Sequence, residues 1–176
     1  MLTLQRCAIA AMLAACSAAP VLAAPSVVTL GYAGPMTGPA SAYGKDAANG
    51  VSMAIQHLNA EHASIDGKPV TWKVDVEDDQ GDPKQATVVA QKFADEKVNG
   101  VVGHLESGCT YPASRIYDRA GIPEITPAST DPKIAQQGFK TFFRMLANDD
   151  AIGAGLAQYA VHHLHDKTAA VVDDGT

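Results

Sequence analysis

Residues 100–114, GVVGHLESGCTYPAS, contain the transition that decides the fold. The first six residues are mostly small and apolar, a pattern that predicts a short buried strand. Ser, Gly, Cys and Thr follow, and a helix is predicted to begin among them. In parallel α/β sheets, ligands bind beyond the carboxyl ends of the strands, where loops lead into helices. The polar residues of this stretch therefore occupy the position of a binding loop.

The same alternation continues on both sides of this stretch. Apolar or alternating runs predict further strands at residues 27–33, 71–79 and 140–145, a short one within 122–130, and a last one within 168–176. Helical periodicity predicts helices over residues 42–61 and 149–165, and Asp82 with Pro83 is typical of a capped helix start. This order predicts an α/β fold, a parallel sheet with helices on both faces.

The composition and the N-terminus bound the class of protein. The chain has 176 residues, a net charge of -6 and 47% hydrophobic residues, which suits one domain core and gives no support for nucleic-acid binding. Residues 1–23 are predicted to be a signal peptide, with Arg6 before an apolar segment too short to span a bilayer. Residues 13–16 also fit a lipobox, which would make Cys16 a lipid anchor. Both alternatives predict a periplasmic location.

Two loops carry the residue types of an anion site. A helix that begins near Ser107 offers unpaired N–H groups and the positive end of its dipole. The second loop, TPASTDP at residues 126–132, also follows a short strand and is rich in hydroxyls. Capping and turn formation alone would explain both loops. The alternative is that Ser107 and Thr130 grip one anion between them.

Enzyme, metal and nucleotide sites have weak support. The Leu105–Glu106–Ser107–Gly108 segment lacks the leading Gly of a nucleophile elbow, and no G-x-G-x-x-G spacing or P-loop is present. Cys109, the one cysteine outside the leader, has His104 nearby in sequence only. We therefore predict no catalytic residue and no cofactor.

Two sets of residues raise the question of a metal. The histidines near residue 163 suit the last turn of a helix, and the aspartates near residue 80 lack EF-hand spacing, so a solvated loop with an N-cap is expected there. The full sets are His162, His163 and His165, and Asp78, Asp79 and Asp82. We predict no metal site.

The loops and the helices that follow them resemble a known family. The segments GPMTGPASAYGKDAANGVSMAIQHLNA, DDQGDPKQATVVAQKFADEKVNGVVGH, SGCTYPAS and ITPASTDP are similar, in the same order, to substrate-binding proteins of branched-chain amino-acid ABC importers. The resemblance implies a two-lobed type I periplasmic-binding fold. Residues 24–146 would form an incomplete first lobe, without its C-terminal return segment, and residues 147–176 would begin the second.

The resemblance also implies a ligand site. Leu105 and Ser107 match the loop that holds the ligand's α-carboxylate. Ala128 and Thr130, with Ser129 between them, match the loop that binds the α-ammonium group through a backbone carbonyl and both ends of the ligand through a Thr. Tyr43 matches an aromatic residue beside the ligand, although from the sequence alone it could equally be a packing residue.

One pair of positions departs from the family pattern. Some relatives carry a disulfide where this chain has Gly81 and Glu106. A carboxylate that pointed into an anion site would disfavour a ligand carboxylate, so we expect the Glu106 side chain to point outward as a helix-start charge.

The expected function follows from the resemblance. A monomer would capture an amino acid or a similar small solute and deliver it to a membrane permease. The alternative is a periplasmic sensor of amino acids, amides or small organic acids that uses the same fold.

Overall fold

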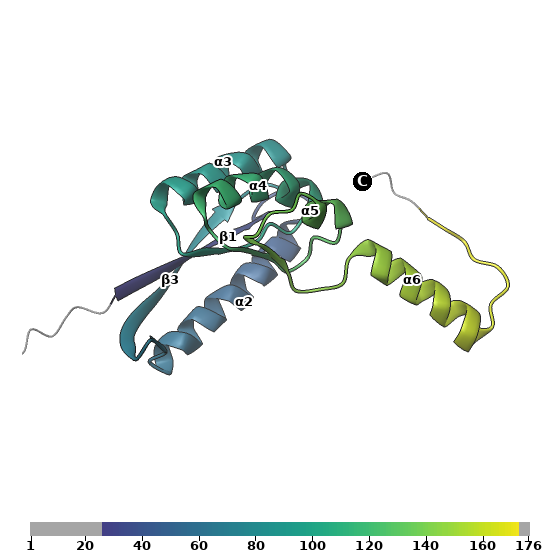
Figure 1. The fold of residues 1–176 in the computed structure, drawn as a ribbon, viewed down its shortest axis with the longest axis horizontal. Coiled ribbons are helices and arrows are strands. Elements are labelled where there is room, and N and C mark those ends of the chain that lie inside the picture. The colour runs from purple at the N-terminus through teal and green to yellow at the C-terminus, as the bar shows by residue number, and fades with distance from the viewer. Residues whose placement is uncertain (1–25, 173–176) are drawn as a thin grey trace, which may run out of the picture.

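The computed structural model describes residues 26–172, which form a mostly parallel sheet with helices on both faces (Figure 1). The strand order is β2-β3-β1-β4-β5-β6, and only the β2–β3 pair is antiparallel. The predicted fold class is therefore confirmed. The strands are β1 (Ser26–Gly34), β2 (Ser64–Ile65), β3 (Lys68–Asp78), β4 (Gly100–Val102), β5 (Glu124–Thr126) and β6 (Phe142–Arg144). The helices are α2 (Ser41–Ala60), α3 (Pro83–Glu96), α4 (Ser107–Ala120), α5 (Pro132–Gln136), α6 (Asp149–Tyr159) and the π-helical turn η1 (Ala160–Leu164).

Helices cover the two faces of the sheet unequally. α2 lies against one face, and α3 and α4 lie side by side on the other (Figure 1). The larger apolar cluster fills the α3–α4 side, where Phe93 and Tyr117 are fully buried. Phe93 packs so closely on β1 that a Cβ added at Gly31 would lie 2.7 Å from its ring. The small residue in the strand thus allows the helix to approach.

The predicted start of α3 is confirmed in detail. Asp82 is the N-cap, and its carboxylate accepts hydrogen bonds from the backbone N–H groups of Lys84 and Gln85. Pro83 occupies the first turn, where its missing N–H costs no hydrogen bond. Local chemistry is sufficient to begin the helix at this residue.

A β-hairpin precedes the long strand β3, and the predictions above did not include it. Ile65 pairs with Lys68 across a two-residue turn, with φ of 51° at Asp66 and 72° at Gly67. Positive φ at both turn residues is the requirement of a type I′ turn, and Asp-Gly is among the dipeptides that best meet it. The signal was therefore present in the sequence.

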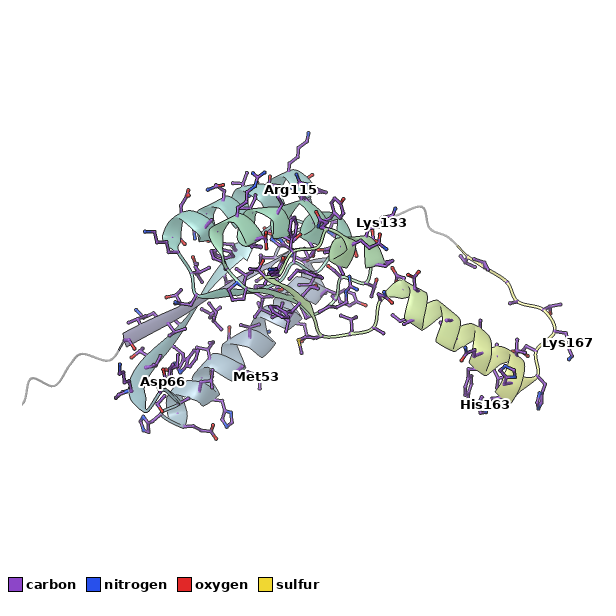
Figure 2. All side chains as sticks on the ribbon, in the orientation of Figure 1. Met53, Asp66, Arg115, Lys133, His163 and Lys167 are labelled. Carbon is purple, nitrogen blue, oxygen red and sulfur yellow. The ribbon has the colours of Figure 1, made fainter. Side chains whose placement is uncertain are left out.

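The predicted strand at residues 168–176 is wrong where it can be checked, because residues 168–172 form no strand. A strand needs a neighbour for its backbone hydrogen bonds, and residues 168–172 pair with none of the described strands. The predicted helix before it is present as α6, but Ile152 and Leu156 on its apolar side are exposed. Figure 2 shows the side chains of this segment, including His163 and Lys167, standing apart from the sheet.

The predicted leader and the alternative lipidation of Cys16 lie outside the described residues. Within residues 26–172, no helix is both long enough and apolar enough to cross a membrane. The division into lobes at residue 146 stays a prediction.

Candidate ligand-binding site

The carboxyl ends of β1, β4 and β5 lie at one edge of the sheet, because these strands are parallel neighbours. The loops after them lead into α2, α4 and α5. Behind the first loop, the Tyr32 hydroxyl donates to the Gly44 carbonyl at 2.7 Å, and Tyr32 is fully buried. This bond fixes the first turn of α2, which carries Tyr43, against the end of β1.

The helix α4 begins at Ser107, as predicted, but without a side-chain cap. Glu106 is the N-cap residue, and its carboxylate makes no capping hydrogen bond. Its backbone carbonyl accepts from the N–H groups of Cys109 and Thr110, which leaves the first two N–H groups of the helix without a cap. This helix start can therefore receive an anion.

The Ser107 hydroxyl joins the two predicted loops. Its oxygen accepts a hydrogen bond from the backbone N–H of Asp131 at 3.3 Å. The Ser107 hydroxyl therefore does not cap its own helix, although capping was the simpler interpretation of the sequence. Because an oxygen that accepts this bond still carries its own proton, Ser107 remains able to donate to a ligand.

A buried hydroxyl cluster lies directly behind this junction. Three hydroxyl oxygens lie within hydrogen-bond distance of the His104 carbonyl oxygen, that of Thr126 at 2.7 Å, that of Thr110 at 3.1 Å and that of Ser129 at 3.2 Å. The Ser129 oxygen also lies 3.0 Å from the Leu105 carbonyl and 2.6 Å from the Thr110 hydroxyl, and each hydroxyl donates its single proton to one of these acceptors. The hydroxyl cluster of Thr110, Thr126 and Ser129 thus holds the two loops together.

The imidazole of His104 is fully buried between two polar partners. Its Nδ1 lies 2.7 Å from an Asp79 carboxylate oxygen, and its Nε2 lies 3.1 Å from the Tyr117 hydroxyl. With the proton at Nδ1, the ring donates to Asp79 and accepts from Tyr117. Both ring nitrogens are therefore engaged in a structural contact.

Cys109 has the wrong environment for a nucleophile. The thiol is fully buried, and burial, with the charges of Asp79 and Glu106, raises its pKa to about 12. The thiolate is the reactive form of cysteine, and it would be almost unpopulated at neutral pH. His104 is committed to Asp79 and Tyr117, so no base is placed for the thiol.

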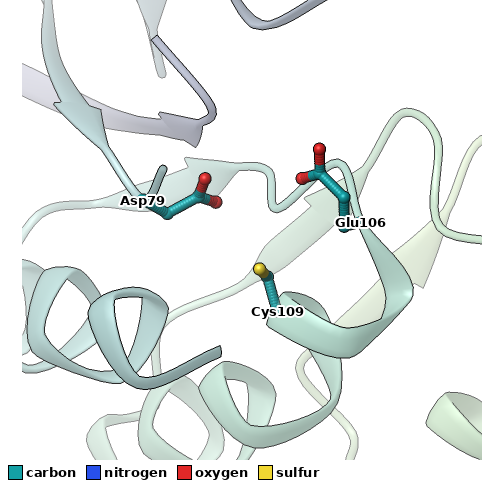
Figure 3. Close-up of side chains that lie close together, drawn as sticks. All are labelled: Asp79, Glu106 and Cys109. Carbon is teal, nitrogen blue, oxygen red and sulfur yellow. The ribbon is translucent and has the colours of Figure 1, made fainter. Parts of the chain in front are cut away.

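The outward orientation expected for Glu106 is wrong. Its side chain is half-buried and turns toward Asp79 and Cys109, as Figure 3 shows. One carboxyl oxygen lies 3.6 Å from the position that a Cβ at Gly81 would take, and the other is buried without a partner among the described residues. Burial and the charge of Asp79 raise the pKa of the Glu106 carboxyl. A Cβ at residue 81 would thus be in ordinary van der Waals contact with this side chain.

Asp79, Glu106 and Cys109 offer ligand atoms within 4.8 Å of one another, which is a metal-compatible spacing that the sequence did not predict. Asp79 is also fully buried, contrary to the expectation of a solvated loop. Its carboxylate accepts from the Gly81 N–H and pairs with His104. Burial raises the pKa of both the Cys109 thiol and the Glu106 carboxyl, which disfavours the anionic forms in which these groups bind a metal.

The structure places the predicted site residues at different depths. Leu105 is buried against Tyr32, and Ser129 is buried in the hydroxyl cluster. Ala128 is exposed and Thr130 half-buried, and no hydrogen bond within residues 26–172 uses the Ala128 carbonyl or the Thr130 hydroxyl. Tyr43 is 78% exposed and lines a shallow hollow with Ala42 and Asp46.

Bonds therefore link the loops of Ser107 and Thr130 into one unit, while Tyr43 lies in the first turn of α2, the helix that follows β1. Sequence reasoning missed Thr110, Thr126 and Arg144, which support this unit. The hydroxyl residues were visible in the quoted segments, but their inward direction was not.

Comparison with known proteins agrees with this architecture. Residues 27–176 match the periplasmic binding protein family. The chain belongs to this family. A Leu/Ile/Val-binding protein homolog 1 of Brucella melitensis is 40% identical over 149 residues, which are 85% of this chain and 39% of that protein. An amino acid binding protein of Pseudomonas aeruginosa is 40% identical over 148 residues, which are 84% of this chain and 39% of that protein.

A solved structure supports the same assignment. The branched-chain amino acid transporter substrate-binding protein of Streptococcus pneumoniae, in complex with isoleucine, has a TM-score of 0.71 and 27% sequence identity. The superposition covers 80% of this chain and 39% of that one. The chain thus spans about two fifths of the length of the relatives that it matches. The relatives compared above are described as amino-acid-binding proteins, and one of them as the substrate-binding protein of a transporter.

Proposed function

We propose that this chain forms the ligand-capturing part of an extracytoplasmic substrate-binding protein that supplies an amino acid, in the first place a branched-chain one, to an ABC importer. The observation that carries the proposal is the bond between the Ser107 hydroxyl and the Asp131 N–H. It joins an uncapped helix start to a loop that presents the Ala128 carbonyl and the Thr130 hydroxyl.

These groups suit the two ends of an amino acid. The Ser107 hydroxyl and the first N–H groups of α4 are donors placed at the positive end of a helix dipole, which favours a carboxylate. The Ala128 carbonyl is an acceptor suited to an ammonium group, and the Thr130 hydroxyl can serve either end. Tyr43 would cover the ligand from the first loop. Leu105 and Ser129 would support the site from the interior, Leu105 through apolar packing and Ser129 through the hydroxyl cluster.

The half-buried Glu106 is compatible with an anionic ligand. Its carboxyl is turned toward Asp79, and its raised pKa increases the neutral fraction. Both effects weaken its repulsion of a ligand carboxylate.

The mechanism is non-catalytic. Residues 24–146 would belong to the first lobe, and residues from 147 onward would begin a second lobe that closes over the ligand. The closed monomer would then dock on a membrane permease. The relatives named as Leu/Ile/Val-binding and amino acid binding proteins support this ligand class.

A thermal-shift screen of the full-length protein against amino acids, amides and small organic acids tests the proposal. A ligand that binds only the native state raises the melting temperature by mass action. We expect leucine, isoleucine or valine to raise it in a concentration-dependent way. A shift with aromatic or aliphatic acids alone would contradict the ammonium half of the site, and no shift with any amino acid would contradict the proposed ligand class.

Isothermal titration of the 176-residue form beside the full-length protein tests the two-lobe mechanism. We expect the full-length protein to bind far more tightly, because lobe closure adds contacts to the ligand. Tight binding by the shorter form alone would contradict it.

A further inference from the structure

The loop after β5 is held in place through three of its consecutive backbone carbonyl groups. All three accept hydrogen bonds from the segment that begins at the end of β6. The Arg144 guanidinium donates from Nε to the Ser129 carbonyl at 2.8 Å and from Nη2 to the Asp131 carbonyl at 2.6 Å. Between them, the Thr130 carbonyl accepts from the backbone N–H of Asp149 at 3.0 Å. Every carbonyl from residue 129 to residue 131 is thus fixed from one side.

The N–H groups of the same loop are fixed from the other side. Ala128 and Ser129 donate their N–H groups to the Thr126 hydroxyl at 3.3 and 3.0 Å, and Asp131 donates to Ser107. The Ala128 carbonyl and the Thr130 hydroxyl lie between these anchors and are free of hydrogen bonds within residues 26–172. The anchors therefore set the direction of the two groups that face outward.

Arg144 is itself held in place. It is the last residue of β6, and Phe142 lies two residues earlier on the same face of the strand. The guanidinium carbon lies over the Phe142 ring, 5.5 Å from its centre, within the range of a cation–π contact. The Arg144 side chain thus bridges the backbone carbonyls of Ser129 and Asp131, which have one residue between them.

The contact between Arg144 and the loop also lies where the chain leaves the sheet. Arg144 ends β6, and Asp149 begins α6, none of whose residues is buried among the rest of the described chain. The direction of the connection at residues 145–148 is therefore tied to the same loop that presents Ala128 and Thr130. A displacement of the loop would be passed to the start of α6.

From this arrangement we infer that Arg144 is a positioning residue for ligand binding, one that orients the 128–131 loop and couples it to the connection leading into α6. The inference rests on the proposed function, since it assumes that Ala128 and Thr130 contact an amino acid. Arg144 acts through the loop and does not itself touch the ligand.

Two variants of the full-length protein test this role. Arg144→Gln removes the forked donor, and Arg144→Lys keeps the charge but offers a compact ammonium that cannot reproduce the planar fork. Arg115→Gln is the matched control, because Arg115 is exposed on α4 and its loss changes the charge by the same amount (Figure 2). Leucine affinity is measured by isothermal titration, and backbone order is measured by hydrogen exchange with and without leucine.

We expect Arg144→Gln to weaken leucine binding roughly tenfold, the usual effect of losing a charge-assisted hydrogen bond. Arg144→Lys should fall between it and the wild type, and Arg115→Gln should bind as the wild type does. Exchange should accelerate at residues 126–131 and at Asp149, while the amides of β1 and β3 keep their protection. If Arg144→Gln fails to fold, the same comparison is made with Arg144→Lys.

Unchanged affinity and unchanged loop exchange in both variants would overturn the inference. A uniform loss of protection across the sheet would also overturn it, because that result indicates a purely structural role. Failure of the wild-type protein to bind any amino acid would instead reject the proposed function. Exchange without ligand would then still decide whether Arg144 orders the loop.

Discussion

The hydroxyl oxygens of Thr110 and Ser129 lie 2.6 Å apart in the interior, and this pair joins the first turn of α4 to the loop after β5. Both oxygens also lie within hydrogen-bond distance of the His104 carbonyl. The two hydroxyls therefore form their hydrogen bonds within the protein. We propose that Ser107 and Thr130, one on each of the same two segments, meet the ligand.

Ser107→Ala is expected to weaken ligand binding strongly in the full-length protein. The change removes a donor to a charged carboxylate, and such hydrogen bonds contribute about 1.5–3 kcal/mol, or roughly 10- to 150-fold in affinity. Isothermal titration with leucine measures the loss. Ser52→Ala is the control, since the Ser52 hydroxyl bonds only the Ala48 carbonyl within α2. Equal affinities of Ser107→Ala and wild type would remove Ser107 from the site.

His104→Ala is expected to destabilise the fold severely. It leaves the buried Asp79 carboxylate without its ring partner and opens a cavity beside Tyr117. Removing the donor from a buried carboxylate leaves an uncompensated charge, which typically costs about 3–5 kcal/mol of unfolding free energy. Urea denaturation followed by circular dichroism measures this value.

His57→Ala is the matched control for that experiment. His57 is exposed on α2 and pairs only with Glu61 one turn away, so its loss should change stability by about 0.5 kcal/mol or less. A His104→Ala variant as stable as His57→Ala would contradict the structural role of the Asp79–His104–Tyr117 chain.

The sheet and most helices could be predicted because their signals are local. Alternating apolar runs and the Asp82–Pro83 start need only nearby residues, and the structure contains both features. The strand predicted at residues 168–176 was wrong at residues 168–172, because a strand also requires a neighbour that local pattern cannot supply.

The two loops that form the candidate site could be predicted from the sequence, but the contacts between them could not. Which hydroxyl points inward depends on packing between segments that are distant in sequence, as the Ser129 contacts with His104 and Leu105 show. Glu106 shows the same limit. Its inward direction places it beside Asp79, 27 residues earlier in the sequence.

Cys109 is expected to resist thiol reagents in the native protein. The thiol is fully buried, and its pKa of about 12 leaves almost no thiolate at pH 8. Labelling with a disulfide reagent should be slow in buffer and fast in denaturant, measured on protein that lacks residues 1–23 so that Cys109 is the one thiol. Rapid labelling of the native protein would contradict both the burial and the assignment of Cys109 to the core.

From the burial of Glu124 we predict an unusual pH dependence of the protein's unfolding free energy. It is 1% exposed at the start of β5, and neither carboxyl oxygen has a hydrogen-bond partner among the described residues. Burial raises its pKa from 4.5 to about 9. Between those values the native carboxyl keeps a proton that the unfolded chain releases. The contribution of Glu124 to stability is therefore greatest at low pH and falls as pH rises through this window.

Glu124→Gln should remove this dependence, because the amide is neutral in both states. Relative to the variant, the wild type should lose on the order of 1 kcal/mol of unfolding free energy per pH unit between pH 5 and pH 8. Urea denaturation at each pH measures the difference. Asp66→Asn is the control, since it removes one carboxyl group from an exposed residue of the hairpin turn (Figure 2). Parallel stability curves for wild type and Glu124→Gln would mean that the carboxyl finds a charged or hydrogen-bonded partner in solution.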